Sequence, residues 1–171
     1  MRDKYTVVQR LEQRGYEILG KGAFSTVMAK PGANTVIRVS SDATFPVYAE
    51  WAHSSRYAGW FAPMVYEMHT YKWGHMARVE RLDATFHQMR GILELPLDAR
   101  YSAQQWNKQF PGFSEFVDKV TKAGFCGDWH PGNWMVMRGS DGRAARVVLT
   151  DPQGGESCER RRWTYRTLRA A

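Results

Sequence analysis

The sequence predicts an α+β fold in which a five-stranded antiparallel sheet precedes a mostly helical region. Apolar and β-branched segments separated by turn signals, such as the Pro-Gly-Ala-Asn run at residues 31–34, indicate the strands. Residues 114–122 carry apolar side chains at helical spacing. Of the 171 residues, 43% are hydrophobic, which is enough to bury a core in one domain or in two small lobes that share a cleft.

Composition and charge indicate a protein outside the membrane. No stretch approaches the roughly 20 consecutive apolar residues of a membrane span, and the N-terminus has no apolar signal core. Cys126 and Cys158 fit neither a metal-binding spacing nor a disulfide framework, so we expect a reducing, cytoplasmic compartment. The net charge is +7, partly from an Arg-rich tail at residues 160–169. We expect this tail to be a solvated helical face, and contact with an acidic partner is the alternative.

Five segments are expected to pair as the antiparallel sheet. They are residues 16–19, 26–29, 35–40, 61–71 and 75–82. A Pro-Gly-Ala-Asn turn at residues 31–34 precedes the third, which is rich in β-branched residues, and residues 72–74 join the last two. In the third segment, alternation places Val36 and Arg38 on one face and Ile37 and Val39 on the other.

Four segments show helical patterns. They are residues 3–15, 46–57, 101–110 and 114–122. Pro46 suits the first turn of the second helix. The fourth helix is the clearest, because Ser114 is a suitable N-cap and Gly124 suits the position just past its end.

The Gly/Pro-rich loop at residues 126–133, Cys-Gly-Asp-Trp-His-Pro-Gly-Asn, carries candidate catalytic chemistry. Asp128 precedes Asn133 by five positions, so a carboxylate can approach a substrate hydroxyl while the amide oxygen ligates a metal. Asp, Pro, Gly and Asn are also common in turns, so an ordinary surface turn is the alternative.

A hairpin after this loop is expected to bring Asp151 back beside Asn133. Its strands are residues 134–137 and 146–150, and a Gly-Ser-Asp-Gly turn at residues 139–142 joins them. One carboxylate and one amide oxygen form a sparse ligand set. Mg²⁺ suits such a set because it keeps waters and takes phosphate oxygens as further ligands.

Three stretches in this order resemble the protein-kinase-like superfamily. Residues 19–27 (Leu-Gly-Lys-Gly-Ala-Phe-Ser-Thr-Val), residues 126–133 and residues 147–154 (Val-Val-Leu-Thr-Asp-Pro-Gln-Gly) are similar to its Gly-rich loop, catalytic loop and metal-binding Asp motif. The Gly-Asp-x-His-Pro-Gly-Asn spelling is similar to that of aminoglycoside-phosphotransferase-like and small microbial or phage-type kinases. The resemblance covers residues 16–154.

The resemblance implies a protein-kinase-like bilobal fold. Residues 1–82 would form an N-lobe with the five-stranded sheet and the Gly-rich loop. Residues 83–171 would form a much reduced helical C-lobe with the catalytic loop, the metal-binding Asp and the basic tail.

The resemblance also implies a site for ATP and Mg²⁺. Asp128 would orient the attacking hydroxyl and accept its proton, while Asn133 and Asp151 would hold the ion. The residues expected to contact ATP are Gly20, Lys21, Gly22, Phe24, Ser25, Val27, Val36, Arg38, Glu50, Glu80 and Leu82. Glu80 and Leu82 belong to the hinge, whose backbone groups would meet the adenine edge.

Two of these positions depart from the family's pattern. Ser25 stands where the family has a third glycine. Arg38 stands where it has the lysine that holds the α- and β-phosphates, and arginine is a planar fork and not a point charge. Glu50 is expected to pair with Arg38 as the family's Glu pairs with its Lys, and an exposed Glu50 is the alternative.

Two classes of function follow. The first is an ATP- and Mg²⁺-dependent phosphotransferase that acts on a protein Ser/Thr or a small-molecule hydroxyl. The alternative is a catalytically inactive kinase-like binding module that inhibits or regulates a partner protein. Few residues follow Asp151 compared with a full protein kinase. The chain is therefore expected to be a minimal kinase, a domain completed as a homo-oligomer, or a degenerate binding descendant.

Overall fold

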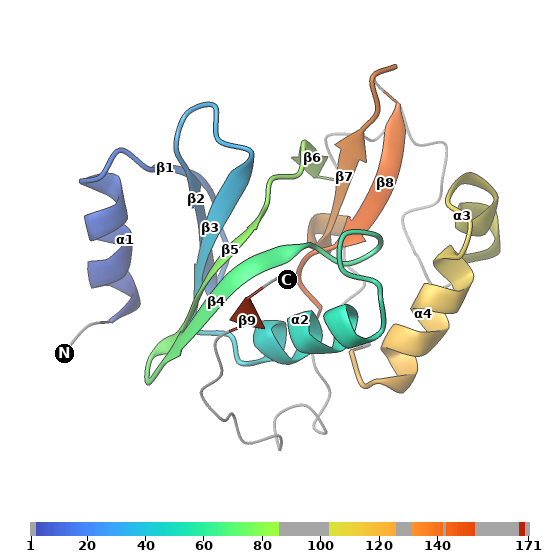
Figure 1. The fold of residues 1–171 in the computed structure, drawn as a ribbon, viewed down its shortest axis with the longest axis horizontal. Coiled ribbons are helices and arrows are strands. Elements are labelled where there is room, and N and C mark those ends of the chain that lie inside the picture. The colour runs from blue at the N-terminus through green and yellow to red at the C-terminus, as the bar shows by residue number, and fades with distance from the viewer. Residues whose placement is uncertain (1–2, 86–102, 126–130, 142, 153–167, 170–171) are drawn as a thin grey trace. The chain divides into compact units, whose positions relative to one another are not determined.

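The computed structural model of the chain describes residues 3–85, 103–125, 131–141, 143–152 and 168–169 (Figure 1). The chain divides into two compact units, which are described separately. The sheet unit comprises residues 1–46, 64–81 and 162–171, and the hairpin unit comprises residues 47–63 and 82–161. In the described parts of both units, no helix has the length and apolar character needed to cross a lipid bilayer.

The sheet unit is built on one antiparallel sheet. Its strands are β1 (Glu17–Lys21), β2 (Ser25–Ala29), β3 (Thr35–Ser40), β4 (Val65–Tyr71), β5 (Gly74–Glu80) and β9 (Leu168–Arg169). They lie in the order β1-β2-β3-β5-β4-β9 (Figure 1). The first five strands confirm the predicted five-stranded antiparallel sheet. β9 corrects the expected helical tail over its two residues, which pair with Glu67 and Met68 of β4. Residues 160–167 lie outside the described part of the chain.

Alternation along the strands gives this sheet two different faces. Leu11 of α1 (Lys4–Glu12) packs with Met28 and Val39 in a buried cluster on one face. Val36 and Arg38 alternate with Val39 along β3, so they lie on the opposite face, as predicted.

The second helix begins earlier than the sequence predicted. In α2 (Thr44–Ser54), the carboxylate of Asp42 accepts hydrogen bonds from the N–H groups of Thr44 at 2.8 Å and Phe45 at 3.3 Å. These N–H groups have no partner within the helix, and a capping aspartate satisfies them. Asp42 therefore sets the start of α2, and Pro46 falls within the first turn.

The strand expected over residues 61–71 begins at Val65. Phe61 belongs to the hairpin unit, where its C=O accepts a hydrogen bond from the N–H of Leu149 at 2.9 Å. The apolar run misled because periodicity alone does not separate a strand from a buried connecting segment.

The hairpin unit contains a small sheet and two helices. Its elements are β6 (Ala84–Thr85), α3 (Ala103–Gln109), α4 (Phe113–Lys122), a 3₁₀ helix (Pro131–Asn133), β7 (Trp134–Arg138) and β8 (Ala144–Leu149). The strand order is β6-β7-β8. β7 and β8 form the predicted hairpin, and the N–H of Gly139 donates to the C=O of Arg143 at 2.8 Å across its turn.

The start of α4 differs from the prediction in how it is capped. Its N-cap is Gly112, with φ 88°, and the helix begins one residue before Ser114. The side-chain oxygen of Asn107, on α3, accepts the N–H groups of Gly112 at 3.0 Å and Ser114 at 3.3 Å. The neighbouring helix thus provides the acceptor expected from Ser114. Gly124, with φ 92°, ends the helix as predicted.

Aromatic side chains form the core of the hairpin unit. Trp106, Phe113, Phe116 and Trp134 are each at most 2% exposed. The ring centroids of Trp106 and Phe113 lie 4.7 Å apart, and those of Phe113 and Trp134 lie 5.5 Å apart. Aromatic pairs at these distances stabilise a core beyond the area that they bury. This core fixes Trp134, which directly follows Asn133.

Candidate functional site

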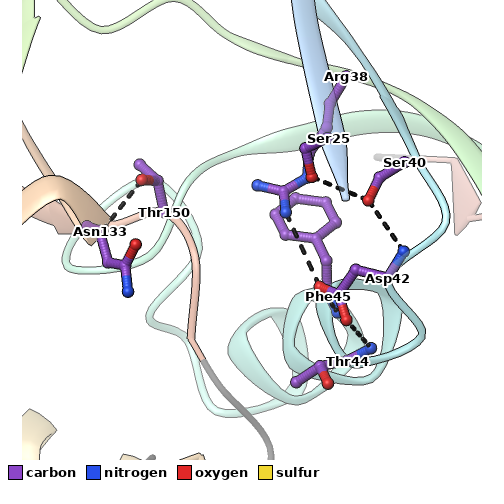
Figure 2. Close-up of polar contacts among 8 residues, drawn as sticks. All are labelled: Ser25, Arg38, Ser40, Asp42, Thr44, Phe45, Asn133 and Thr150. Atoms are coloured by element: carbon purple, nitrogen blue, oxygen red, sulfur yellow. Dashed lines mark hydrogen bonds and ion pairs between the residues drawn. The ribbon is translucent and has the colours of Figure 1, made fainter. Parts of the chain in front are cut away.

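Asn133 and Thr150 meet at the end of the β7–β8 hairpin. Trp134 pairs with Leu149 in the hairpin register, so the next residues face each other just beyond it. The N–H and the hydroxyl of Thr150 both donate to the C=O of Asn133, at 2.8 Å and 3.0 Å (Figure 2). Asp151 follows directly, and both Asn133 and Asp151 are half-buried. The hairpin therefore returns the Asp151 backbone to the neighbourhood of Asn133, as its turn predicted.

The end of β8 is fixed by two further hydrogen bonds. The N–H of Leu149 donates to the C=O of Phe61 at 2.9 Å, and the C=O of Leu149 accepts from the Tyr48 hydroxyl at 3.0 Å. Burial raises the pKa of Tyr48 well above its usual value, so its hydroxyl stays protonated and able to donate. The backbone that leads into Asp151 is therefore held by the hydrogen bonds of Leu149 with Phe61 and Tyr48.

The oxygen atoms at this hairpin suit a magnesium ion that also takes water and phosphate ligands. Asn133 can offer an amide oxygen and Asp151 a carboxylate, which are the hard ligands that Mg²⁺ prefers. Within the described residues, no three His, Cys, Asp or Glu side chains cluster to hold a metal. Asp128, the predicted catalytic residue, lies outside the described residues.

The Gly-rich stretch forms the turn between β1 and β2. Gly20 and Lys21 lie in β1, and the N–H of Gly22 donates to the C=O of Ser25 at 2.8 Å. A Cβ added at Gly20 or Gly22 would meet no heavy atom within 4 Å, so packing does not explain either glycine. Phe24, at the tip, is 63% exposed. Open backbone beside an exposed aromatic ring fits a turn that covers a ligand.

Ser25, at the position of the third glycine in the kinase pattern, faces inward. It is 8% exposed, and its hydroxyl donates to Oγ of Ser40 at 2.8 Å. The same Ser40 oxygen accepts the N–H of Asp42 at 3.0 Å. The Ser25 side chain therefore links β2 to the end of β3, which accounts for a residue larger than glycine at this position.

Arg38 lies beside Asp42 and Phe45 (Figure 2). Its Nη2 is 3.8 Å from Oδ2 of Asp42, and its guanidinium carbon is 4.1 Å from the centroid of the Phe45 ring. Val27 pairs with Arg38 across β2 and β3, and Val36 is two residues away, so both valines share its face of the sheet. The carboxylate beside Arg38 is thus Asp42, whereas the sequence suggested Glu50, which is exposed on α2.

His75 packs against Phe45, the aromatic neighbour of Arg38. The two rings are stacked, with centroids 5.4 Å apart and planes inclined by 13°. His75 is 1% exposed. Burial, followed by the nearby charge of Arg38, lowers the pKa of His75 to about 3. His75 is therefore a neutral core residue at pH 7.

The expected hinge is partly occupied by structural hydrogen bonds. The N–H of Glu80 donates to the C=O of Met64 at 3.0 Å, and Oε1 of Glu80 accepts the N–H of Met64 at 2.7 Å. The N–H of Arg81 donates to the C=O of Asn34 at 3.1 Å. Glu80 thus has a structural task in the sheet unit. Leu82 forms none of these bonds.

Three positioning residues escaped the sequence analysis. Asp42 could have been found as an N-cap, because it lies two positions before Thr44 at the start of a helical pattern. Thr150 and Tyr48 act through Asn133 and Leu149, which are distant in sequence. No local pattern could have signalled the contact of Tyr48 with Leu149, whereas the hairpin register places Thr150 opposite Asn133.

No family model matches this sequence, and no curated protein matches it. Among solved structures, the crystal structure of residues 1–466 of Rad53, a protein kinase, in complex with AMP-PNP is similar over 90% of this chain. The TM-score is 0.51, and 15% of the aligned residues are identical. The fold is kinase-like. This chain spans 43% of the Rad53 structure. The kinase-like fold agrees with the mixed α+β class expected from the sequence, and the activity has to be argued from the site.

Proposed function

We propose that this chain is an ATP- and Mg²⁺-dependent phosphotransferase. The observation that carries the proposal is the pair of hydrogen bonds from Thr150 to Asn133, which brings the backbone of Asp151 back to Asn133. Kinases use an amide oxygen and a carboxylate for the metal, and an Asp five residues before that Asn for the acceptor hydroxyl. The AMP-PNP bound to Rad53, whose fold is similar, supports nucleotide binding here.

Each side chain has one task in this proposal. Asn133 and Asp151 bind Mg²⁺, which neutralises charge on the phosphates during transfer. Asp128 accepts the proton of the attacking hydroxyl. The turn at Gly20–Ser25 covers the phosphates, and Arg38 donates to their oxygens. The acceptor is a hydroxyl of a protein Ser/Thr or of a small molecule.

A binding module without catalysis is the second candidate, and the burial of Arg38 favours it. Arg38 is 6% exposed and is already beside Asp42 and Phe45. A side chain held in this way can serve the fold alone. In that case the domain inhibits or regulates a partner protein, and its retained acidic residues have no catalytic task.

Incubation of the purified protein with γ-labelled ATP and Mg²⁺ tests the first candidate. Cell extract and hydroxylated small molecules serve as acceptors. We expect label on the protein itself or on an acceptor, and none after chelation of the metal. The Asp128→Asn variant, purified in parallel, controls for a contaminating kinase. Absence of transfer by the wild type would exclude phosphotransfer to the acceptors tested, and an active Arg38→Lys variant would then identify a decayed kinase.

A further inference from the structure

Arg38 is held by two neighbours of different chemistry. The carboxylate of Asp42 lies 3.8 Å from its Nη2, and the Phe45 ring lies under its guanidinium carbon at 4.1 Å (Figure 2). The Arg38 side chain is 8% exposed and that of Asp42 is 19% exposed. A guanidinium stacks on aromatic rings and pairs with carboxylates through its planar fork, and an ammonium group does neither as well. These neighbours therefore explain arginine at a position where the family has lysine.

Three hydrogen bonds with residues other than Arg38 hold Asp42 in place. Its N–H donates to Oγ of Ser40 at 3.0 Å. Its Oδ1 accepts the N–H of Thr44 at 2.8 Å, and its Oδ2 accepts that of Phe45 at 3.3 Å. The oxygen that lies nearest Arg38 is thus held by the first turn of α2. A carboxylate that accepts two hydrogen bonds, on a residue whose backbone N–H is also bonded, can impose a direction on the longer and more flexible arginine side chain.

We infer that Asp42 is the positioning residue for Arg38, in the role that the sequence assigned to Glu50, and that Phe45 is the platform for the guanidinium. The inference rests on the proposed function, in which Arg38 contacts the phosphates. A guanidinium presents five N–H donors in a fixed fork geometry, so a carboxylate on one side of it sets where the others point. Holding the fork in one orientation before the nucleotide arrives saves the cost of ordering it during transfer.

Asp42→Asn separates the charge from the helix cap. Asparagine is as good an N-cap as aspartate. Its single side-chain oxygen can keep the 2.8 Å bond from the N–H of Thr44, while the 3.3 Å bond from Phe45 is lost and Arg38 loses its anionic neighbour. We expect kcat for phosphate transfer to fall about tenfold. The KM for ATP should change little, because the positive charge of Arg38 remains. A purely structural role of Asp42 would instead lower the melting temperature and leave kcat unchanged.

Two other acidic residues give the comparison. Glu50→Gln tests the competing assignment and should lower kcat less than Asp42→Asn does. Glu12→Gln removes the same charge from an exposed position on α1. It controls for the change in net charge of the sheet unit. A loss in Glu50→Gln as large as that in Asp42→Asn would overturn the inference.

A double variant shows whether Asp42 acts through Arg38. In the Arg38→Lys background, Asp42→Asn should have little further effect on kcat, whereas independent roles would give multiplied losses.

If the wild type neither binds nor uses ATP, the proposed function fails. The pairing is then decided by urea unfolding of Arg38→Met, Asp42→Asn and the double variant. Coupled changes in stability would support the pairing of Asp42 with Arg38, and additive changes would refute it.

Discussion

The candidate metal ligands and the candidate phosphate-binding arginine of this chain are held in place in different ways. In the hairpin unit, Asn133 is bonded through its backbone C=O, which accepts both donors of Thr150. In the sheet unit, Arg38 is held by side chains, the carboxylate of Asp42 and the ring of Phe45.

This difference matches where the sequence agrees with the kinase pattern. Asn133 and Asp151 at the hairpin match the kinase pattern, whereas Ser25 and Arg38 in the sheet unit differ from it. Where backbone hydrogen bonds hold a residue in place, its side chain remains available to bind a ligand. The chemistry of that ligand then limits which residue type can stand there. A position set by neighbouring side chains can change type when those neighbours change with it.

The largest expected effects lie in the catalytic carboxylates. Asp128→Asn should lower transfer by about 100-fold or more and leave ATP affinity nearly intact, because Asp128 acts on the acceptor hydroxyl. Asp151→Asn should weaken both, because it removes a charged metal ligand. ATP titrations and transfer rates of the two variants check this division. Identical ATP affinities in both variants would contradict it.

The buried group around His75 should make the sheet unit sensitive to acid. The unfolded chain has a His75 pKa of 6.5, and the folded protein has one of about 3. Below pH 6.5 the unfolded chain therefore takes up a proton that the folded protein does not. Stability should be constant above this pH and fall by about 2 kcal/mol by pH 5, at 1.36 kcal/mol per pKa unit. Urea unfolding of the wild type and His75→Phe checks this, and equal pH slopes would contradict it.

Arg38→Lys tests whether the Arg38 side chain acts in phosphate transfer. In an enzyme that uses the arginine fork, the change should lower activity about tenfold, or ~1.4 kcal/mol. In a decayed kinase it would restore the family's residue and raise activity from near zero. Arg38→Ala is the companion variant. Unchanged transfer in both variants would show that residue 38 only packs in the sheet unit.

The smallest effects should distinguish the hydrogen bond of Thr150 from that of Ser25. Thr150→Val and Ser25→Ala each remove one hydroxyl hydrogen bond and should cost about 1 kcal/mol of stability. Of the two, Thr150→Val should also weaken the dependence of transfer on Mg²⁺, because Thr150 bonds Asn133 and Ser25 bonds Ser40. Thr150→Ser keeps the hydroxyl and serves as the control. Equal Mg²⁺ dependence in Thr150→Val and Ser25→Ala would show that the Thr150 bond has no specific role in metal binding.

Local patterns predicted most of the fold. The five strands, the alternation at Arg38 and the β7–β8 hairpin follow from periodicity and turn residues in short windows. Features that depend on distant segments were not predictable. The place of Phe61 in the hairpin unit and the pairing of β9 with β4 are of this kind.

The same distinction applies within the candidate site. Asn133 and Asp151 could be proposed from motif spacing, and a tight turn between two strands accounts for the return of Asp151. The carboxylate beside Arg38 could not be assigned in this way, because it depends on where α2 begins relative to the end of β3. The family pattern pointed to Glu50, since a resemblance carries residue positions and not the contacts of a replaced side chain.

The central claim is that the hairpin unit provides a metal site completed by a nucleotide. Thermal unfolding with ATP alone, Mg²⁺ alone and both together tests this claim most directly. Asn133 and Asp151 leave most coordination positions to phosphates and water, so ion and nucleotide should bind cooperatively. We expect little stabilisation by either one, clear stabilisation by both, and loss of this effect in Asp151→Asn. No extra stabilisation with both present, or an effect unchanged in Asp151→Asn, would contradict the account.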